Sequence, residues 1–267
     1  MSTFRDQVVI VTGASSGIGR ALCLELAPQR PRLVLSARDA ARLEQVADEC
    51  RARGAQALVV PADVSLEDDC RRLVERAAQE FGGLDVLVNN AGQSMWASFE
   101  ELRDLSVYER LMRVNYLSCV WLTHAALPHL RRSRGRLVVM ASVAGLTGVP
   151  TRTGYAASKH AVFGFFDSLR IELRGSGVTV TLVAPDFVVS EIHRRSIGPD
   201  GRALGASPMQ EARIMSAEQC ARLTVAAMER RRRLAILSRR GRLGRFVRLL
   251  APGLIDRIAL RAVQSGR

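Results

Sequence analysis

Residues 8–19 read VVIVTGASSGIG, a continuous apolar run followed at once by a glycine-rich turn. An apolar run of this kind is expected of a strand that helices cover on both faces. Gly13, Gly17 and Gly19 let the chain turn tightly, and the turn opens a helix whose free N–H groups can hold a pyrophosphate. The stretch therefore predicts a parallel α/β sheet that binds a dinucleotide at its first βα turn.

The rest of the chain repeats this alternation of short apolar runs and longer amphipathic stretches. We expect strands over residues 7–12, 32–37, 56–60, 84–89, 136–141, 178–184 and 234–238. Helices are expected over residues 17–29, 39–53, from 65 onward, twice within 99–132, and over 155–174 and 216–230. Asp39, Ser65 and Ser216 are the predicted N-caps, with Asp68 completing a capping box.

The predicted fold class is α/β, a single-domain Rossmann fold with a doubly wound, seven-stranded parallel sheet. The dinucleotide-binding and catalytic unit is expected to span residues 1–238, and a basic, helical C-terminal extension to span residues 239–267.

Composition excludes several classes of protein. The five cysteines are odd in number and scattered without a CxxC pair, which is typical of a reducing compartment. The four histidines show no metal-ligand spacing, so we expect no metal site. No targeting signal and no run of eighteen apolar residues is found, and we expect a cytoplasmic protein.

The end of the second strand indicates which dinucleotide is bound. Enzymes that use NAD usually place an acid there to bind the ribose 2′-hydroxyl, whereas a base accommodates the 2′-phosphate of NADP. The sequence reads Ser36-Ala37-Arg38, with alanine at the expected acidic position and arginine next to it. Asp39 follows and is assigned to helix capping. The pattern favours NADP(H).

Residues 155–159 read YAASK and contain a candidate proton donor, Tyr155. Tyrosine and lysine four residues apart share one helix face, and a nearby ammonium favours the phenolate. Lys159 is the only lysine in a chain with 38 arginines, and arginine cannot replace a compact ammonium. Ser142 and the segment Asn89-Asn90-Ala91-Gly92 end two other predicted strands, at the sheet edge where ligands bind.

These motifs together resemble the short-chain dehydrogenase/reductase family over about residues 7–238. The resemblance rests on TGASSGIG, Asp63-Val64, NNAG at residues 89–92, Asn115, Ser142, YAASK and Pro185. It implies hydride transfer between NADP(H) and a carbonyl or alcohol. In that reaction Tyr155 would be the general acid/base, and Lys159 would lower its pKa and hold the nicotinamide ribose. Ser142 would bind the substrate oxygen, and Asn115 would keep a water next to Lys159.

The same resemblance implies the remaining site residues and the assembly. A homodimer or homotetramer acting on a small molecule is expected. The residues expected to bind cofactor are Gly13, Ser15, Ser16, Gly17, Ile18, Gly19, Arg38, Asp63, Val64, Asn89, Ala91, Gly92, Tyr155, Lys159, Pro185, Val188 and Ser190.

One position departs from the family pattern. Asp186 follows Pro185 where the family usually has glycine, and its carboxylate has no evident role in the sequence. Ser190 can replace the usual threonine as a hydroxyl donor.

The segments around residues 155–169, 198–201 and 250–254 are most similar to the membrane-associated branch of hydroxysteroid and acyl-dihydroxyacetone phosphate reductases. That branch predicts a hydrophobic lipid, steroid or acyl substrate.

Other functions stay open at this point. A 3-oxoacyl thioester reductase is the nearest alternative, although such enzymes usually end soon after the seventh strand. A dehydratase, an epimerase or a non-catalytic dinucleotide-binding scaffold can share the fold. The presence of Asn115, Ser142, Tyr155 and Lys159 together favours simple hydride transfer over these.

The C-terminal tail is strongly basic. Residues 230–267 contain twelve arginines and one acid, Asp256, and so carry +11 of the formal +13. Apolar residues recur at helical spacing through the tail, and Pro252 should divide it into two helices. The tail is predicted either to bind an anionic membrane surface or to cover the substrate pocket or a subunit contact. Nucleic-acid binding is disfavoured because no stacking platform or reading helix is present.

Overall fold

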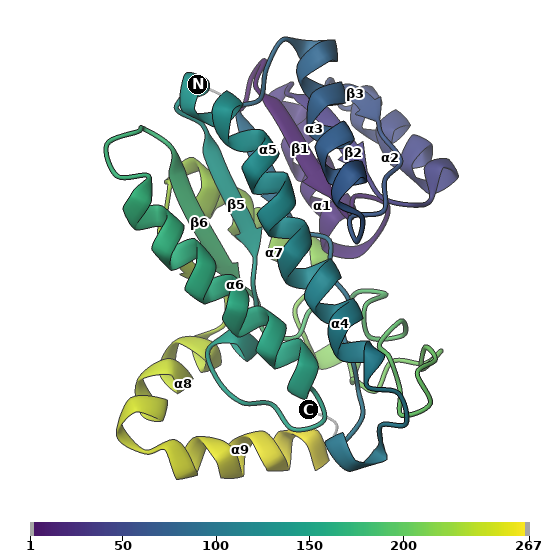
Figure 1. Cartoon of the computed structure of the whole chain (residues 1–267), viewed down its shortest axis with the longest axis vertical. Helices are drawn as coiled ribbons and strands as arrows, with labels where there is room; N and C mark the ends of the chain where they lie inside the picture. Colours follow the sequence, from purple (N-terminus) through teal and green to yellow (C-terminus); the bar gives the residue numbers. More distant parts are fainter. Residues whose placement is uncertain (1–2, 265–267) are drawn as a thin grey trace.

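The computed structural model describes residues 3–264 and contains one parallel sheet in the order β3-β2-β1-β4-β5-β6-β7 (Figure 1). The strands are β1 (Val8–Thr12), β2 (Arg32–Ser36), β3 (Gln56–Val59), β4 (Val86–Asn89), β5 (Arg136–Met140), β6 (Thr179–Ala184) and β7 (Leu234–Ile236). All seven predicted strands are confirmed to within two residues at each end. The order reverses between β1 and β4, which is the switch point where ligands bind in such sheets.

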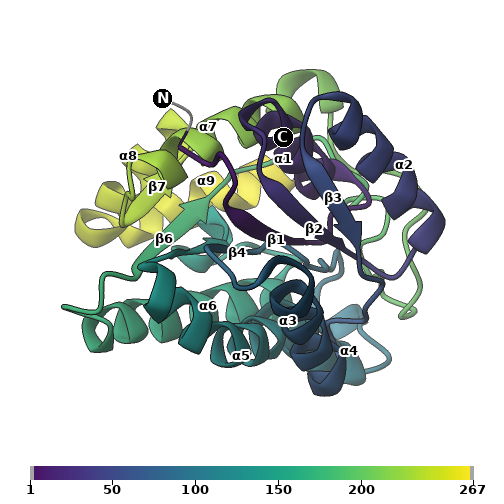
Figure 2. The same ribbon diagram turned by 90° about the horizontal axis from the view of Figure 1, so that it is seen from above.

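Helices cover both faces of the sheet (Figure 2). One face carries α1 (Gly17–Leu26), α2 (Ala40–Ala52) and α7 (Ala217–Glu229), and the other carries α3 (Glu67–Phe81), α5 (Ser118–Ser133) and α6 (Thr153–Glu172). The central strands β1, β4 and β5 are buried along their whole length, because each faces a helical layer on both sides. This burial explains the continuous apolar runs at residues 8–11, 86–88 and 137–140.

The shorter elements complete the chain. Helix α4 (Ser106–Met112) runs through a π-helical turn, Arg113–Leu117, directly into α5. Short 3-10 turns lie at Ala27–Gln29, Phe99–Glu101, Val143–Gly145 and Glu211–Arg213. The predicted break at Pro252 is confirmed, since α8 (Arg239–Leu250) ends and α9 (Pro252–Gln264) begins there.

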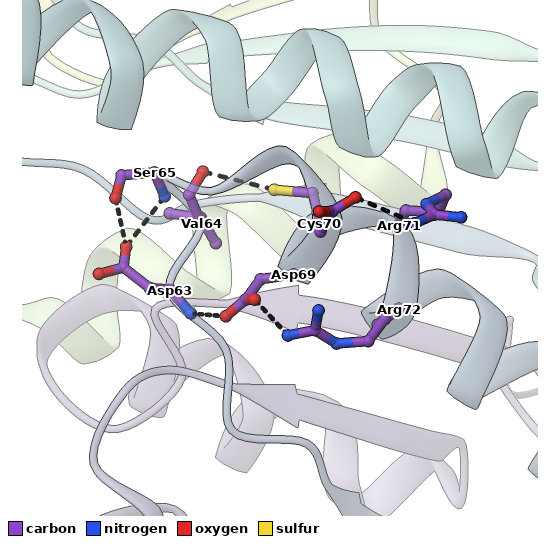
Figure 3. A network of polar contacts seen from close by, with 8 residues as sticks. Asp63, Val64, Ser65, Asp69, Cys70, Arg71 and Arg72 are labelled. Carbon is purple, nitrogen blue, oxygen red and sulfur yellow. Dashed lines mark hydrogen bonds and ion pairs between the residues drawn. The ribbon is translucent and has the colours of Figure 1, made fainter.

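Two of the three predicted caps are correct. The Asp39 carboxylate accepts a hydrogen bond from Arg42 N at 3.0 Å, and the Ser216 hydroxyl accepts one from Gln219 N at 3.1 Å. The predicted cap at Ser65 is wrong. Its hydroxyl donates instead to the Asp63 carboxylate at 2.8 Å, and α3 begins two residues later with Leu66 at the N-cap position (Figure 3).

Helices α8 and α9 lie across the end of the molecule where the strands finish (Figure 1). Gly241 of α8 packs so closely that an added Cβ would lie 2.7 Å from the Val143 side chain and 3.0 Å from Ile236. Val143 follows Ser142 directly, so the extension sits on the edge of the sheet that carries the candidate site.

Candidate active site

The glycine-rich turn after β1 leaves an open cradle. Gly13 and Gly17 have positive φ angles of 66° and 52°, which favour glycine. A Cβ on Gly19 would collide with the Gly13 carbonyl oxygen and lie 2.6 Å from Asn90 Nδ2. Asn90 Nδ2 donates to Thr12 O at 2.8 Å and so joins the turn to the end of β4. Only glycines allow this approach, which leaves the N-terminus of α1 free to face a ligand.

A groove runs outward from this cradle. Of the residues predicted to bind cofactor, it is lined by Gly13, Ser15, Ser16, Gly17, Ile18, Gly19, Arg38, Asp63, Val64, Ala91, Gly92 and Ser190. Further lining residues that were not predicted come from α2 and from the segment after β6, chiefly Arg42, Glu191 and Arg195. They lie far apart in the sequence and within no recognised motif.

The charges of the groove distinguish Arg38 from the other arginines. Arg42 binds Glu191 at 3.2 Å, and Arg195 also pairs with Glu191. Arg38 is exposed and, among residues 3–264, has no hydrogen-bond or ion-pair partner. Its guanidinium is therefore available to an anionic group in the groove.

Asp63 and Val64 are held in place by the start of α3 (Figure 3). The Asp63 N–H donates to the Asp69 carboxylate at 2.8 Å, and the Cys70 thiol donates to Val64 O at 3.4 Å. Asp63 Oδ1 accepts from both Ser65 N and Ser65 Oγ. These contacts fix the rim of the groove, so Ser65 contributes through Asp63 and not as a helix cap.

The predicted proton-transfer residues meet in a second cavity of about 220 Å³ that adjoins the groove. Tyr155 and Lys159 line it from one face of α6, and Ser142 lines it from the end of β5. Pro185 and Val188, also predicted to bind cofactor, line it from the segment after β6. The cavity and the groove share Ile18, Asn90, Gly92, Ser190 and Ile192, so a long ligand can occupy both.

Within this cavity Lys159 is almost fully buried. Its Nζ donates to Met140 O at 2.8 Å and lies 5.8 Å from the centroid of the Tyr155 ring. Ser142 Oγ accepts a hydrogen bond from Ala144 N at 3.2 Å, which leaves its own proton free to donate. A phenol, an ammonium and a hydroxyl are thus gathered around one space.

Two of the predicted residues lie behind the cavity. Asn115 is buried in the π-helical turn, where its Nδ2 donates to Ser158 Oγ and to Gln93 O, both at 2.9 Å. Ser158 precedes Lys159, so Asn115 braces this part of α6. Asn89 Nδ2 donates to Thr123 Oγ1 at 3.3 Å in the core, and Asn89 does not line the groove. The structure therefore places Asn89 in contact with α5, while Asn90 beside it reaches the cradle.

The structure gives Asp186 a role that its sequence did not reveal. Its carboxylate accepts hydrogen bonds from Arg240 Nε and Nη2, both at 3.1 Å, and from Ser238 Oγ at 3.1 Å. Arg248 further along α8 donates to Leu146 O. The Asp186 carboxylate therefore holds the extension over the cavity, and Gly241, Gly244, Ile255, Ile258 and Ala259 form part of its lining.

Two further lining residues were missed because no motif contains them. Arg152 and His193 are both buried, and burial lowers the pKa of the Arg152 guanidinium to about 10, so it remains charged at neutral pH. Burial, followed by the positive charge of Arg152, lowers the pKa of His193. No local sequence pattern marks either residue, because only the folded chain brings both beside Phe187.

The cradle, the groove and the cavity suit a dinucleotide. An unobstructed helix N-terminus can hold a pyrophosphate, and the free Arg38 suits a charged ribose substituent. The adjoining cavity then offers a proton donor and a hydroxyl to a reacting group.

Within residues 3–264, no helix is both long enough and apolar enough to cross a bilayer.

Comparisons with known proteins agree with this geometry. The family model for short chain dehydrogenases matches residues 7–198. The "Dehydrogenase/reductase SDR family protein 7-like" of Dictyostelium discoideum is 35% identical over 261 residues, covering 96% of this chain and 81% of that protein. The "11-beta-hydroxysteroid dehydrogenase 1A" of Arabidopsis thaliana is 37% identical, covering 94% of this chain and 73% of that protein.

A solved structure supports the same assignment. A short chain dehydrogenase/reductase from Burkholderia phymatum in complex with NAD superimposes with a TM-score of 0.83 and 30% identity, covering 95% of this chain and 96% of that one. The resemblance to the hydroxysteroid dehydrogenase branch is confirmed by the curated relatives. This chain belongs to the short-chain dehydrogenase family of oxidoreductases.

Proposed function

We propose that this protein is an NADP(H)-dependent oxidoreductase that moves hydride between the nicotinamide and a carbonyl or secondary alcohol of a hydrophobic substrate. The observation that carries the proposal is the shared cavity of Tyr155, Lys159 and Ser142, which opens into the groove around the glycine-rich turn. When bound, NADP(H) would supply or accept the hydride.

The side chains of this cavity divide the proton chemistry between them. Tyr155 would give a proton to the substrate oxygen during reduction and take it back during oxidation. The buried ammonium of Lys159 would stabilise negative charge on the Tyr155 oxygen. Ser142 would donate a hydrogen bond to the substrate oxygen, and Asn115 would keep α6 and a water in place near Lys159.

The preference for NADP(H) rests on the rim of the groove. Ala37 leaves room beside the end of β2, and Arg38 has no hydrogen-bond or ion-pair partner among the described residues. A 2′-phosphate would receive charge-assisted hydrogen bonds from Arg38. The pyrophosphate would lie on the backbone of Gly13–Gly19, with Asp63, Val64, Ala91 and Gly92 around the adenosine and Pro185, Val188 and Ser190 near the nicotinamide.

The apolar lining of the cavity supports a hydrophobic substrate. Large apolar side chains contribute from four separate parts of the chain: Ile18, then Met140, Leu146 and Val149, then Phe187 and Ile192, and finally Ile255 and Ile258. A lipid, steroid or acyl body would bury apolar surface against them.

An NADPH-oxidation screen tests this proposal. The purified protein should oxidise NADPH with at least one of a set of aldehydes, ketosteroids, 3-oxoacyl thioesters and acyl ketone phosphates. Tyr155→Phe keeps the ring and loses the proton, so turnover should fall by about 10²–10⁴ while NADPH binding survives. Near wild-type turnover by Tyr155→Phe would overturn the assignment of the acid/base.

We also propose that the extension, residues 239–267, touches anionic membrane from outside while its inner face covers the cavity. The support is an exposed apolar stripe on α8 that includes Leu243 (66% exposed), Phe246 (64%) and Leu250 (88%), interspersed with arginines. Basic residues near an anionic leaflet contribute about 1 kcal/mol each. Residues 1–238 would then form the catalytic unit.

Vesicle co-sedimentation tests the membrane contact. Full-length protein should bind anionic vesicles at low salt, release them at high salt, and ignore neutral ones. A variant with aspartate at Leu243, Leu250 and Leu254 should lose binding and keep its turnover of a water-soluble substrate. Equal sedimentation of this variant and the wild type would contradict the proposal.

We also propose that the protein is a homodimer or homotetramer. Light scattering, which measures the molar mass in solution, tests this separately.

A further inference from the structure

Arg152 is a buried cation inside the substrate cavity. It lies on the turn that begins α6, three residues before Tyr155, and only 6% of it is exposed. Its guanidinium carbon is 4.5 Å from the centroid of the Trp96 ring, 5.0 Å from that of Phe187 and 5.9 Å from that of Tyr155. Arg152 therefore lies beside the proposed proton donor, in a wall made of aromatic rings.

No described residue accepts a hydrogen bond from the Nε–Nη2 edge of this guanidinium. Nε and Nη2 of Arg152 are both buried without an acceptor anywhere in the part of the chain that the structure describes. Aromatic faces attract the charge but do not replace acceptors in the guanidinium plane. A buried charged donor without a partner is costly, so an unpaired arginine in a ligand cavity needs a reason.

The other charges of the cavity give Arg152 no hydrogen bond. Among the described residues, Asp186 is the one carboxylate in the lining, and it attracts Arg152 through its charge but accepts its hydrogen bonds from Arg240 and Ser238. The remaining ionisable groups in the lining besides Tyr155 are Lys159, Arg245 and His193. None of these three side chains is an anion that could neutralise the charge of Arg152. The cavity is thus cationic overall and holds one buried guanidinium with two adjacent free N–H donors.

We propose that Arg152 is an anion-binding residue of the substrate site, and that the substrate carries a carboxylate or a phosphate a few bonds from its reacting carbon. Two oxygens of that group would accept hydrogen bonds from Nε and Nη2 side by side. Because the rest of the lining is largely apolar, the substrate is an amphiphilic anion. This inference rests on the proposed function and narrows its substrate class.

Binding to the NADP⁺-saturated enzyme tests the inference without turnover. Three probes share one apolar chain: a medium-chain γ-keto acid, its methyl ester, and the phosphate monoester of the matching keto alcohol. Calorimetric titration of the wild type should show the acid or the phosphate binding at least about tenfold more tightly than the ester. The charged probe whose affinity exceeds that of the ester by the larger factor identifies the anion.

Variants then assign the preference to one side chain. Arg152→Gln removes the charge and should reduce the preference to about twofold or less, while Arg152→Lys should keep part of it as a point charge. Arg222→Gln is the matched control, because Arg222 is an exposed arginine on α7 that lines neither the groove nor the cavity. Arg222→Gln should retain the full preference.

The outcomes separate this inference from the proposed function. Equal binding of ester, acid and phosphate to the wild type would overturn the anion site, and this comparison needs no variant to fold. A preference that survives in Arg152→Gln would overturn it too. If the neutral ester is reduced without any anion preference, the proposed function stands alone. If the anion preference depends on Arg152 but no carbonyl compound is reduced, the anion site stands and the proposed function fails.

Discussion

Arg240→Ala should loosen the helical extension without unfolding the sheet. The pair between Arg240 and Asp186 has two hydrogen bonds of 3.1 Å, and the Asp186 side chain is only 14% exposed. The Arg240 side chain, however, is 57% exposed, so solvent weakens the attraction. We therefore expect a loss of ~1 kcal/mol, the upper end of the range for exposed pairs, and not the larger value of a fully buried one.

Hydrogen exchange measures this change directly. A loss of ~1 kcal/mol raises the population of open α8 by about fivefold, so amides of Arg239–Leu250 should exchange about five times faster. Amides of β5 should be unaffected, because the pair lies outside the sheet. High salt should shrink the difference between Arg240→Ala and the wild type.

Arg239→Ala is the matched control for this experiment. Arg239 begins the same helix, is exposed, and has no ion-pair partner within the described residues. If Arg240→Ala and Arg239→Ala exchange alike, Asp186 does not hold the extension, and the reason given for an aspartate at this position is wrong.

Three further predictions concern the cofactor and the cavity. Ala37→Asp combined with Arg38→Ile should shift the ratio of kcat/KM for NADPH and NADH by at least about tenfold toward NADH, since charge-assisted contacts are worth ~1.5–3 kcal/mol. A wild-type enzyme that already prefers NADH would refute the assignment of Arg38 to the 2′-phosphate. Lys159→Arg should lower kcat by at least about 10² with an unchanged circular dichroism spectrum, because a bulkier guanidinium cannot occupy the buried position of the ammonium beside Met140 O. Gly19→Ala should destabilise the fold by ~1–3 kcal/mol in urea unfolding, because its Cβ meets the Gly13 carbonyl. Gly164→Ala, whose Cβ would meet nothing within 4 Å, should instead be neutral or stabilising.

The sheet could be predicted because its signals are local. Each central strand contains a continuous apolar run, at residues 8–11, 86–88 and 137–140. Asp39 and Ser216 cap helices through residues only three positions away. The cap at Ser65 failed for an instructive reason. The Asp63 carboxylate lies two residues before it and accepts both of its donors, so a turn outcompetes the capping box.

The parts of the site that could not be predicted depend on distant residues. Asp186 is understood only beside Arg240, 54 positions later in the chain. Arg152 looks like one surface arginine among many until Trp96 and Phe187 are seen to enclose it. A composition of 38 arginines conceals such a residue, whereas the single lysine at Lys159 was conspicuous for the same reason.

The basic tail shows that charge alone does not define a surface. Arg240 and Arg248 point back to the body, where they bind Asp186 and the Leu146 carbonyl, so part of the positive charge serves to attach the tail. The apolar residues divide in the same way. Gly241, Ile255 and Ile258 line the cavity, while Leu250 is 88% exposed. Substitutions on the outer face should therefore alter attachment to membranes and leave turnover intact, whereas substitutions on the inner face should alter the choice of substrate.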